Sequence, residues 1–496
     1  MNKTPGCVFL IGAGPGDPDL ISVKGKKTLE QCDVVIYDAL VNDLLIATLP
    51  DYIKKIYVGK RGGEPSAQQA EINELMANEA LKGKFVVRLK GGDPLLLGRG
   101  SEEMEYLRQQ GIPYQIIPGI SSAIAAPACA GIPVTHRNLS RSVAIVTGHL
   151  MAGQPVEKLK LPVADTIVFL MAMQNIDAII SKLLSTENFT KDTPAAIIRN
   201  GTLPDQQVVT GTLGNISSLK KKYEITAPAA FVVGKTASLA KTLKWFKKPS
   251  LAGKRVVILR TPEQSDELLR TLYENGATVV SWPVLKIEPR SLDMVDSAYL
   301  KPFTMIIFTS PNGVKIFLDS MLSQGLDMRH FHGKKIFAIG SGTSKALSGY
   351  GLIADGVPAK FVAEGILGIL PENLIGEHIL IPRASQAREI LPLTLKQRGA
   401  TVTVLPVYDT LKRNDIDCPV KDGDYVLFTS SSTADFFFNH PQCLKKTVIP
   451  CCMGDITAET VRKYHNGNIF IASNATIPSL VRAVLNAAKN KKESNL

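Results

Sequence analysis

The second half of the chain contains an internal repeat, and no other feature limits the possible folds as strongly. The stretch GKRVVILRTPEQSDELLRTLYENGATVVSWPVL begins at Gly253, and GEHILIPRASQAREILPLTLKQRGATVTVLPVY begins at Gly376. A constant offset of 123 residues aligns them without a gap, so that Arg260 matches Arg383. Further on, FTSPNGV matches FTSSSTA, and AIGSGT matches CMGDIT. Chance would explain apolar periodicity but not three matched motifs in order. The repeat therefore predicts two similar α/β units, and two such units usually enclose a ligand-binding cleft.

Strand-like apolar runs alternate with helical stretches in the first half of the chain. They read CVFLIGAG, DVVIYDAL, KFVVRLKGGD, SVAIVTGH, TIVFLMAM, AAIIRNGT and AAFVVGKT. This alternation indicates an α/β fold class with largely parallel sheets. The stretch KWFKKPSLAGKR interrupts the pattern with charge, proline and glycine. We therefore predict an N-terminal module over 1–245, a linker over 246–252, a duplicated module over 253–490 and a flexible tail over 491–496.

The charge balance limits the classes of partner. The net charge of +12 favours an anionic partner but does not identify it. We find no helix-turn-helix spacing, zinc finger or aromatic RNA-binding motif, so nucleic acid is not the expected partner. A small polycarboxylate suits the dispersed arginines and lysines as well or better.

Three further features concern metals, membranes and location. The seven cysteines contain no CxxC pair, so no structural zinc site is expected. No apolar run reaches the length of about 18 residues that a membrane-spanning helix needs. The chain enters a strand and a tight turn near its start, which is unlike a signal peptide. We expect a cytoplasmic protein without metal or membrane partner.

The opening turn GAGPGD, residues 12–17, invites comparison with a dinucleotide-binding turn, which reads GxGxxG. Asp17 stands where the third glycine belongs, and its carboxylate would repel a pyrophosphate. Pro15 and Pro18 lack the amide donors that a phosphate needs. Asp38 does hold the position of a ribose-binding acid. An NAD-dependent dehydrogenase is therefore the rival hypothesis, and the prolines and the missing glycine weigh against it.

Six motifs stand in order over residues 1 to about 245. They are VFLIGAGPGDPDLISVKGKKTLEQCDVVIYDALV, VGKRGG, VVRLKGGDPLLLGRGSEE, PGISSAIAAPACAGIPVTHR, VTGH and NGTLPDQQVVTGTL. In this order and spacing they resemble the tetrapyrrole methylase family, and within it the uroporphyrinogen III C-methyltransferases. The resemblance implies a two-subdomain methylase fold and a homodimer formed through the N-terminal module. It also implies two methyl transfers from S-adenosylmethionine to uroporphyrinogen III, giving precorrin-2.

The same resemblance implies site residues. Those assigned to the S-adenosylmethionine pocket are Gly91, Gly92, Asp93, Leu96, Ser121, Ser122, Met171, Gly201 and Ala230, together with Pro15 in the opening turn, which borders the tetrapyrrole. The family more often has Thr-Ala where this chain has Ser121-Ser122. Asp38 and Lys60 hold the positions of a proton acceptor and a proton donor, which suits a carbon that gains a methyl group. The alternative for Asp38 is a helix cap.

The chemistry implied by the resemblance agrees with the composition. Methyl transfer is an in-line displacement at a sulfonium carbon, so the enzyme mainly supplies alignment and a dry site, without a metal. Uroporphyrinogen III carries carboxylates that forked arginine donors suit. The candidate arginines are Arg61, Arg88, Arg99, Arg137 and Arg141, and the alternative for each of them is a surface residue that binds no substrate.

The motifs FTSPNGV, AIGSGT, LPVYDT, FTSSST and CMGDIT of the second half resemble the uroporphyrinogen III synthase family. The resemblance implies that hydroxymethylbilane is cyclised with inversion of ring D and loss of water, without a cofactor. In that family the chain crosses twice between two domains. Here the crossings would lie near WPVLKI and LPVYDT, so that 251–285 joins 411–490 in one domain. The alternative is a module that binds a tetrapyrrole without chemistry.

The candidate residues of this second module come from its matched motifs. Those assigned to substrate binding are Ser310, Thr343, Ser430 and Thr457. Tyr408 aligns with Leu285, so its phenol has a task beyond the packing that both copies share. We expect its hydroxyl to help the departing hydroxyl group of the bilane leave. The alternative is an aromatic ring that covers the hinge.

Overall fold

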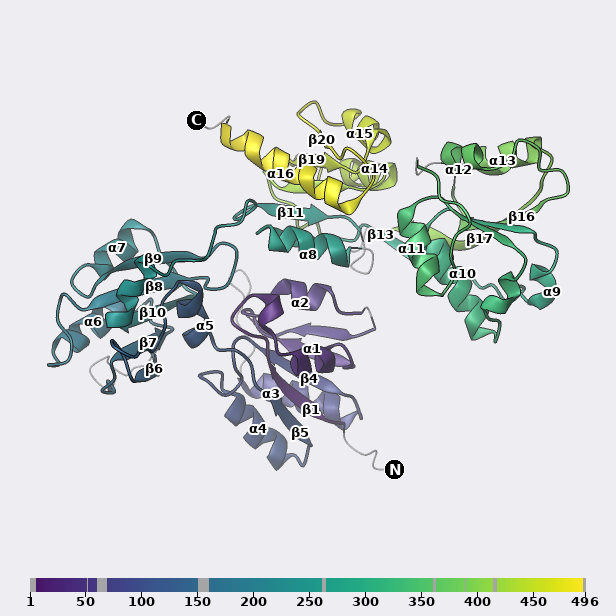
Figure 1. Cartoon of the computed structure of the whole chain (residues 1–496). Helices are drawn as coiled ribbons and strands as arrows, with labels where there is room; N and C mark the ends of the chain where they lie inside the picture. The colour runs from purple at the N-terminus through teal and green to yellow at the C-terminus, as the bar shows by residue number, and fades with distance from the viewer. Residues whose placement is uncertain are drawn as a thin grey trace. The chain divides into compact units, whose positions relative to one another are not determined.

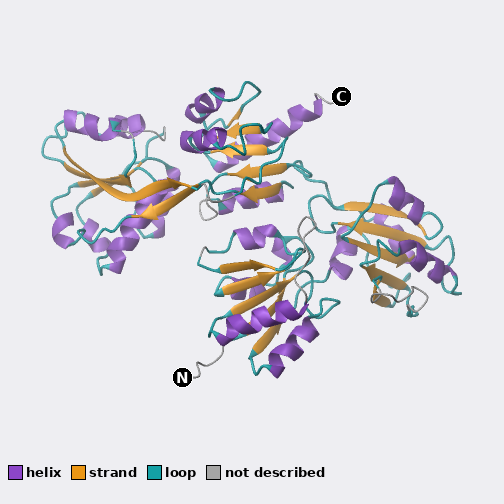
Figure 2. Ribbon diagram, turned by 180° about the vertical axis from the view of Figure 1, so that it is seen from behind, coloured by secondary structure: helices purple, strands orange, loops and turns teal. Residues whose placement is uncertain are grey.

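The structure is a computed structural model that describes residues 6–50, 52–59, 69–149, 160–260, 265–359, 363–387, 389–413 and 417–493. Contacts group the chain into two compact units, built mainly on the residues up to Val256 and on 281–484. The described strands form four five-stranded sheets, drawn in orange in Figure 2. Helices connect most of these strands, so the predicted α/β fold class is confirmed.

The first sheet is parallel throughout, in the order β3-β2-β4-β1-β5. Its strands are β1 (Val8–Gly12), β2 (Val34–Tyr37), β3 (Lys54–Tyr57), β4 (Val86–Lys90) and β5 (Tyr114–Ile117). Helices α1 (Val23–Leu29) and α2 (Asp43–Ala47) cover one face, and α3 (Gln69–Leu81) and α4 (Gly100–Gln109) cover the other (Figure 1). The central strands are apolar because both faces are buried.

The second sheet is mixed, in the order β6-β7-β10-β8-β9. Its strands are β6 (Val143–Thr147), β7 (Thr166–Leu170), β8 (Pro194–Arg199), β9 (Gln207–Thr212) and β10 (Ala229–Gly234). Only the β6–β7 pair is parallel, so the prediction of a largely parallel sheet is wrong here. Residues 200–206 alone join β8 to β9, and a parallel crossover needs a longer connection. Its helices are α5 (Ser122–Cys129), α6 (Ile176–Leu184), α7 (Ile216–Lys222) and the 3-10 helix η3 (Lys235–Lys241).

The sequence repeat reappears as a structural repeat. The first copy contains β11 (Arg255–Ile258), α8 (Asp266–Glu274), β12 (Thr278–Ser281), β14 (Met305–Phe308), α10 (Pro311–Ser323), β15 (Lys335–Ala338) and α11 (Ser341–Gly349). The second contains β16 (His378–Ala384), α13 (Ile390–Gln397), β17 (Thr401–Lys412), β18 (Tyr425–Phe428), α14 (Ser431–Asn439), β19 (Ile449–Cys452) and α15 (Asp455–Arg462). These elements correspond in order, except that β17 spans the counterparts of both β12 and β13 (Leu285–Pro289).

The two copies exchange halves when they form sheets. The orders are β12-β11-β18-β19-β20 and β13-β17-β16-β14-β15, with β13 (Leu285–Pro289) and β20 (Phe470–Ile471) at the edges. Each sheet therefore joins the opening strands of one copy to the closing strands of the other. This confirms the predicted double crossing. The remaining elements are η1 (Pro18–Leu20), α9 (Ser297–Leu300), η5 (Met328–Phe331), α12 (Ala363–Ile369) and α16 (Ile477–Glu493).

Helix α16 continues to Glu493, so it includes the first three residues of the predicted tail over 491–496, and 494–496 lie outside the described residues. Within the described ranges, no helix has the length and apolarity to cross a bilayer.

Candidate functional site

The carboxyl ends of the parallel strands in the first sheet carry most of the residues predicted for methyl transfer. Asp38 follows β2, the segment 91–93 follows β4, and the opening turn follows β1. Ser121 lies beyond the end of β5 and is the N-cap of α5. Ligands of parallel α/β sheets bind at this edge, so the topology gathers the predicted residues in the expected place.

Four glycines let the loops at this edge touch through their backbones. Gly92, with φ of +70°, bridges to Gly14 through N···O distances of 2.7 and 3.3 Å. A Cβ added to Gly119 would lie 2.2 Å from the carbonyl oxygen of Gly92, and one added to Gly12 would lie 2.4 Å from the Cα of Gly119. The opening turn therefore serves close packing of loops. The chain then enters the short helix η1, and α1 begins only at Val23.

Asp93 fastens two of these loops to each other. Its Oδ1 accepts from the backbone N–H of Leu95 at 2.9 Å, and its Oδ2 accepts from that of Gly119 at 3.0 Å. Ser121 caps α5, since its Oγ accepts from the N–H of Ala123 at 3.2 Å, and Ser122 is the first residue of that helix. Asp93 thus fixes the relative positions of the two loops through their backbones.

The residues predicted from the second sheet also come together. Ala230 of β10 pairs with Leu170 and Ile198, so the ends of β7 and β8 lie beside the start of β10. Met171 directly follows β7 and is 51% exposed, and Gly201 lies just beyond β8. These three residues, which the sequence analysis assigns to one pocket, therefore lie at the same edge of the second sheet.

Helix α5 connects the two groups. A Cβ on Gly201 would lie 2.3 Å from the Cβ of Ala126 in that helix. Ala123 and Ala126 share a core cluster with Ala230, and the half-buried Leu96 packs against the same cluster. Gly92 lies at the other end, where its Cβ position is 4.0 Å from the Cα of Ser121. The predicted cofactor residues of both sheets are therefore contiguous through α5.

Unfavourable backbone conformations concentrate in the same loops. Six described residues other than glycine have positive φ, and five of them follow β4, β7 or β8: Leu97, Arg99, Met171, Asn200 and Thr202. Such conformations cost about 1–3 kcal/mol each and cluster at functional sites. The local strain thus marks the same region independently of any sequence motif.

A cluster of buried charges lies beneath Asp38. Arg88 of β4 donates from Nη2 to Asp38 Oδ1 at 2.6 Å and from Nε to Glu103 Oε1 at 3.1 Å. Lys90 donates to the same oxygen of Glu103 at 2.8 Å. The side chains of Arg88, Glu103 and Lys90 are at most 5% exposed, whereas that of Asp38 is 30% exposed. Burial lowers the pKa of Lys90, and the neighbouring Arg88 lowers it further.

The other predicted polar groups have different outcomes. Arg88 is buried and bound within the protein, so the prediction that it contacts substrate is wrong. Arg99 forms a two-pronged ion pair with Glu102 at 2.9 and 2.7 Å, which raises the pKa of Arg99. Arg137 and Arg141 are exposed. Lys60 and Arg61 lie outside the described residues.

Tyr408 and Ser310, two predicted residues of the second module, form a hydrogen bond with each other. Tyr408 of β17 is 7% exposed, and its hydroxyl lies 3.1 Å from the Oγ of Ser310. Ser310 is the N-cap of α10 and accepts from the N–H of Gly313 at 3.0 Å. Burial raises the pKa of Tyr408, so its phenol stays protonated near neutral pH.

The repeat equivalents of these residues occupy equivalent places. Ser430 is the N-cap of α14, with Thr433 completing a capping box. Thr343 and Thr457 are each the third residue of a helix, α11 and α15, and are 2% and 6% exposed. Ser310 and Ser430 are the more accessible pair.

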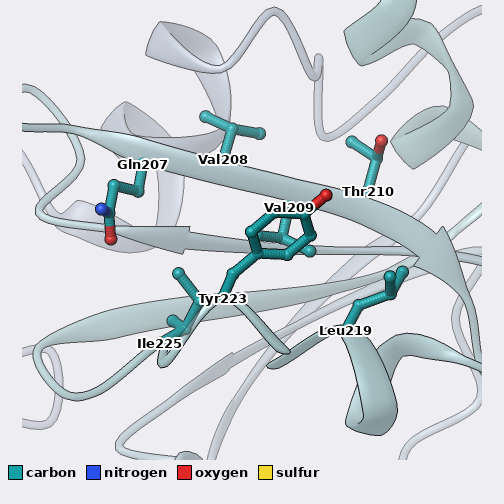
Figure 3. A pocket seen from close by; sticks show the side chains of 7 residues that line it. All are labelled: Gln207, Val208, Val209, Thr210, Leu219, Tyr223 and Ile225. Atoms are coloured by element: carbon teal, nitrogen blue, oxygen red, sulfur yellow. The ribbon is translucent and has the colours of Figure 1, made fainter. Parts of the chain in front are cut away.

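A surface hollow elsewhere contains none of the predicted residues. It is lined by Gln207, Val208, Val209 and Thr210 of β9 and by Leu219, Tyr223 and Ile225 (Figure 3). The lining has no charged side chain and so offers little to a polycarboxylate. Among the residues that the structure describes, no group of three or more histidine, cysteine or acidic side chains could hold a metal ion.

Glu103 and Lys90 are parts of the site region that the sequence analysis missed. The available signal was the strand VVRLK, in which charged residues alternate with apolar ones inside a run expected to be buried. A buried charge needs a partner, so the pattern called for an acidic residue on the covering helix.

Comparison with known proteins agrees with the geometry. Residues 8–217 match the family model of tetrapyrrole (corrin/porphyrin) methylases, and 266–482 match that of uroporphyrinogen-III synthase HemD. The chain is 36% identical to the porphyrin biosynthesis protein HemD of Ruminiclostridium josui, covering 97% of this chain and 98% of that protein. It is 47% identical to the uroporphyrinogen-III C-methyltransferase of Methanocaldococcus jannaschii, covering 47% of this chain and 98% of that protein.

A solved structure gives a further similarity. The uroporphyrin-III-C-methyltransferase of Thermus thermophilus is 36% identical, with a TM-score of 0.42, covering 49% of this chain and 98% of that one. From the sequence comparisons, the chain belongs to the tetrapyrrole methylases in its first half and to the uroporphyrinogen III synthases in its second.

Proposed function

From this membership, we propose that the chain catalyses two consecutive reactions. The second module cyclises hydroxymethylbilane to uroporphyrinogen III with loss of water. The first module then methylates uroporphyrinogen III twice with S-adenosylmethionine, giving precorrin-2 for sirohaem or cobalamin synthesis. We assign residues 1–245 to methylation and 253–490 to cyclisation. The relative that aligns over the whole chain, with both modules in one protein, supports this pairing.

The observation that carries the methylation proposal is the convergence on α5. Its N-cap Ser121 lies at the glycine loops of the first sheet, and its Ala126 touches Gly201 of the second. A cofactor bound along this helix would contact both predicted groups. S-adenosylmethionine supplies an electrophilic methyl group there, and the protein must align it and exclude water.

In each methyl transfer the tetrapyrrole carbon forms a bond to the methyl carbon while the methyl–sulfur bond breaks. The electron pair of that bond returns to sulfur, which leaves S-adenosylhomocysteine. The positive charge on the tetrapyrrole is relieved by loss of a proton, and we assign its acceptance to the carboxylate of Asp38. Lys60 is the proposed proton donor.

For cyclisation we assign Tyr408 as the proton donor to the departing hydroxyl group. Its link to Ser310 at the start of α10 supports this role, because the helix N-terminus also favours a substrate carboxylate. Ser430 at the start of α14 is the equivalent group of the second copy.

The test is to supply the full-length chain with hydroxymethylbilane and S-adenosylmethionine and to identify the products by mass spectrometry. A dimethylated tetrapyrrole of the type III isomer is expected. Methylation of supplied uroporphyrinogen III without cyclisation of the bilane would leave a methyltransferase with a binding module. Light scattering on the same sample tests the homodimer that we expect through the N-terminal module.

A further inference from the structure

The buried arginine of the first sheet has no obvious purpose in folding. Arg88 lies on β4, and its Cα is paired with those of Leu10 on one side and Ile36 on the other. Both neighbours are fully buried. Replacing buried ion pairs by apolar residues of similar volume is often neutral or stabilising. Stability therefore does not explain why a guanidinium occupies the middle of this sheet.

The guanidinium of Arg88 is bound on all three of its nitrogens. Nε donates to Glu103, and Nη2 donates to Asp38. Nη1 lies 3.3 Å from the carbonyl oxygens of both Ile36 and Leu89. Because guanidinium is planar and rigid, these contacts fix its orientation. Ile36 lies in β2 and Asp38 directly follows that strand, so Arg88 holds the Asp38 carboxylate against the backbone of β2.

Glu103 holds the guanidinium from behind. Its Oε1 accepts from Arg88, from Lys90 and from Gln69, whose Nε2 lies at 3.2 Å. The cluster contains two cations, Arg88 and Lys90, and two anions, Asp38 and Glu103, so its charges balance. Of these four, Asp38 alone has substantial exposure. The cluster therefore ends in one carboxylate directed towards the candidate site.

We propose that Arg88 and Glu103 are positioning residues for methyl transfer, which hold the carboxylate of Asp38 in the orientation that receives the substrate proton. The inference rests on the proposed function, since it uses the role assigned there to Asp38. Arg88 and Glu103 act through Asp38 and do not contact the tetrapyrrole. Lys90 neutralises Glu103 and keeps the four charges balanced.

The experiment is a double-mutant cycle on the full-length chain with Arg88→Lys and Asp38→Asn. Lysine keeps the charge of Arg88 but lacks the planar fork that reaches Glu103, Asp38 and the two carbonyls together. Each single variant is expected to lower kcat for methylation of uroporphyrinogen III at least tenfold. The KM for S-adenosylmethionine is expected to stay within twofold. In the Asp38→Asn background, Arg88→Lys is expected to lower kcat less than threefold further.

The chain contains a matched control in Glu79. It is a glutamate on α3, its side chain is 3% exposed, and it pairs with Lys54, Lys82 and Lys84. It shares burial and ion pairing with Glu103, but within the described part of the chain no ion pair or hydrogen bond joins it to Asp38. Glu79→Gln is expected to leave kcat within twofold of the parent. If buried ion pairs acted only through the stability of the fold, mutation of Glu79 and mutation of Glu103 would both reduce kcat.

A second variant keeps the test decisive if Arg88→Lys does not fold. Glu103→Asp retains the charge and withdraws the carboxylate from Arg88 by about one carbon–carbon bond, ~1.5 Å. The same loss of kcat and the same lack of additivity with Asp38→Asn are expected. Two outcomes with an active parent would overturn the positioning role. In the first, the variants keep the full kcat. In the second, the losses of kcat in the single variants multiply in the double variant. A parent chain that forms no methylated product at all would overturn the proposed function and the role with it.

Discussion

The hydroxyl group of Tyr408 lies 3.1 Å from the Oγ of Ser310, although 98 positions separate the two in the chain. The pair joins β17 to the start of α10. Burial raises the pKa of Tyr408, so the phenol is a neutral donor under ordinary conditions. A protonated phenol beside a helix N-terminus can supply a proton while the helix favours a nearby carboxylate.

Tyr408→Phe is expected to slow cyclisation of hydroxymethylbilane by about 10²–10⁴-fold, the usual contribution of a positioned proton donor. The ring and its packing remain, so the loss of stability is expected to be about 1 kcal/mol from the missing hydrogen bond. Rates of uroporphyrinogen III formation are measured alongside the uncatalysed type I isomer, whose share should rise. Methylation of supplied uroporphyrinogen III serves as the internal control. Cyclisation at the parent rate would assign Tyr408 to packing.

The repeat in the sequence predicted most of the second module because it constrains both copies at once. An offset of 123 placed the elements that follow Gly253 on those that follow Gly376, and α8 and α13 correspond as expected. The exchange of halves between sheets came from a family resemblance. Local patterns do not encode it, since a buried strand such as β14 offers backbone hydrogen bonds to either β16 or β11. The mixed order of the second sheet was predictable in part, because the seven residues between β8 and β9 are too few for a parallel crossover.

Gly201→Ala is expected to weaken S-adenosylmethionine binding at least tenfold. The new methyl group would lie 2.3 Å from the Cβ of Ala126, so α5 must shift away, and its N-cap Ser121 moves with it. Overpacking of this kind costs about 1–3 kcal/mol of stability. Calorimetric titration with the cofactor measures the effect. The matched control is Gly368→Ala in α12, where a Cβ meets nothing within 4 Å. If both variants bind S-adenosylmethionine with equal affinity, Gly201 is not part of the cofactor pocket.

Asp93→Asn is expected to weaken cofactor binding more than binding of uroporphyrinogen III. The carboxylate accepts from both Leu95 and Gly119, and an amide keeps one acceptor oxygen instead of two. Loss of one bond to a charged group costs about 1.5–3 kcal/mol of loop order. Cofactor binding has to restore that order, so the Kd rises by at most roughly 10- to 150-fold. Titration calorimetry with each ligand separates the two effects. An unchanged Kd for S-adenosylmethionine would show that the loops keep their shape without Asp93.

The sequence indicated the glycines that lie in the loops of the candidate site. It did not indicate how the buried charged residues beside these loops are paired. Gly201 marks a close approach that only the smallest residue permits, and Gly92 adopts a φ of +70°, a conformation that favours glycine. Arg88 was expected to face substrate because arginine suits carboxylates. Its partner is Glu103, and this pairing depends on which face of α4 covers the sheet. Periodicity in a strand cannot specify that partner.

The stability of the first module is expected to depend on pH through Glu79. Hydrogen bonds from Lys54, Lys84 and Lys82 hold the pKa of Glu79 at about 2, below the ordinary value of 4.5. Because the pKa is lower in the folded chain, the unfolded state binds the proton more readily, so the ionised group stabilises the fold above pH 4.5. This stabilisation is lost as pH falls from 4.5 towards 2. The lysines are more than one-third exposed, and screening by solvent reduces the contribution of Glu79 to the free energy of unfolding to about 1–2 kcal/mol.

Glu79→Gln should therefore lower the thermal midpoint of the first module at pH 7 and 5.5, and the difference from the parent should shrink at pH 3.5. Glu74→Gln, on the exposed side of the same helix, is the control and should change the midpoint little at any of these pH values. A difference for Glu79→Gln that stays constant down to pH 3.5 would contradict the assignment, because an uncharged packing effect has no reason to follow protonation.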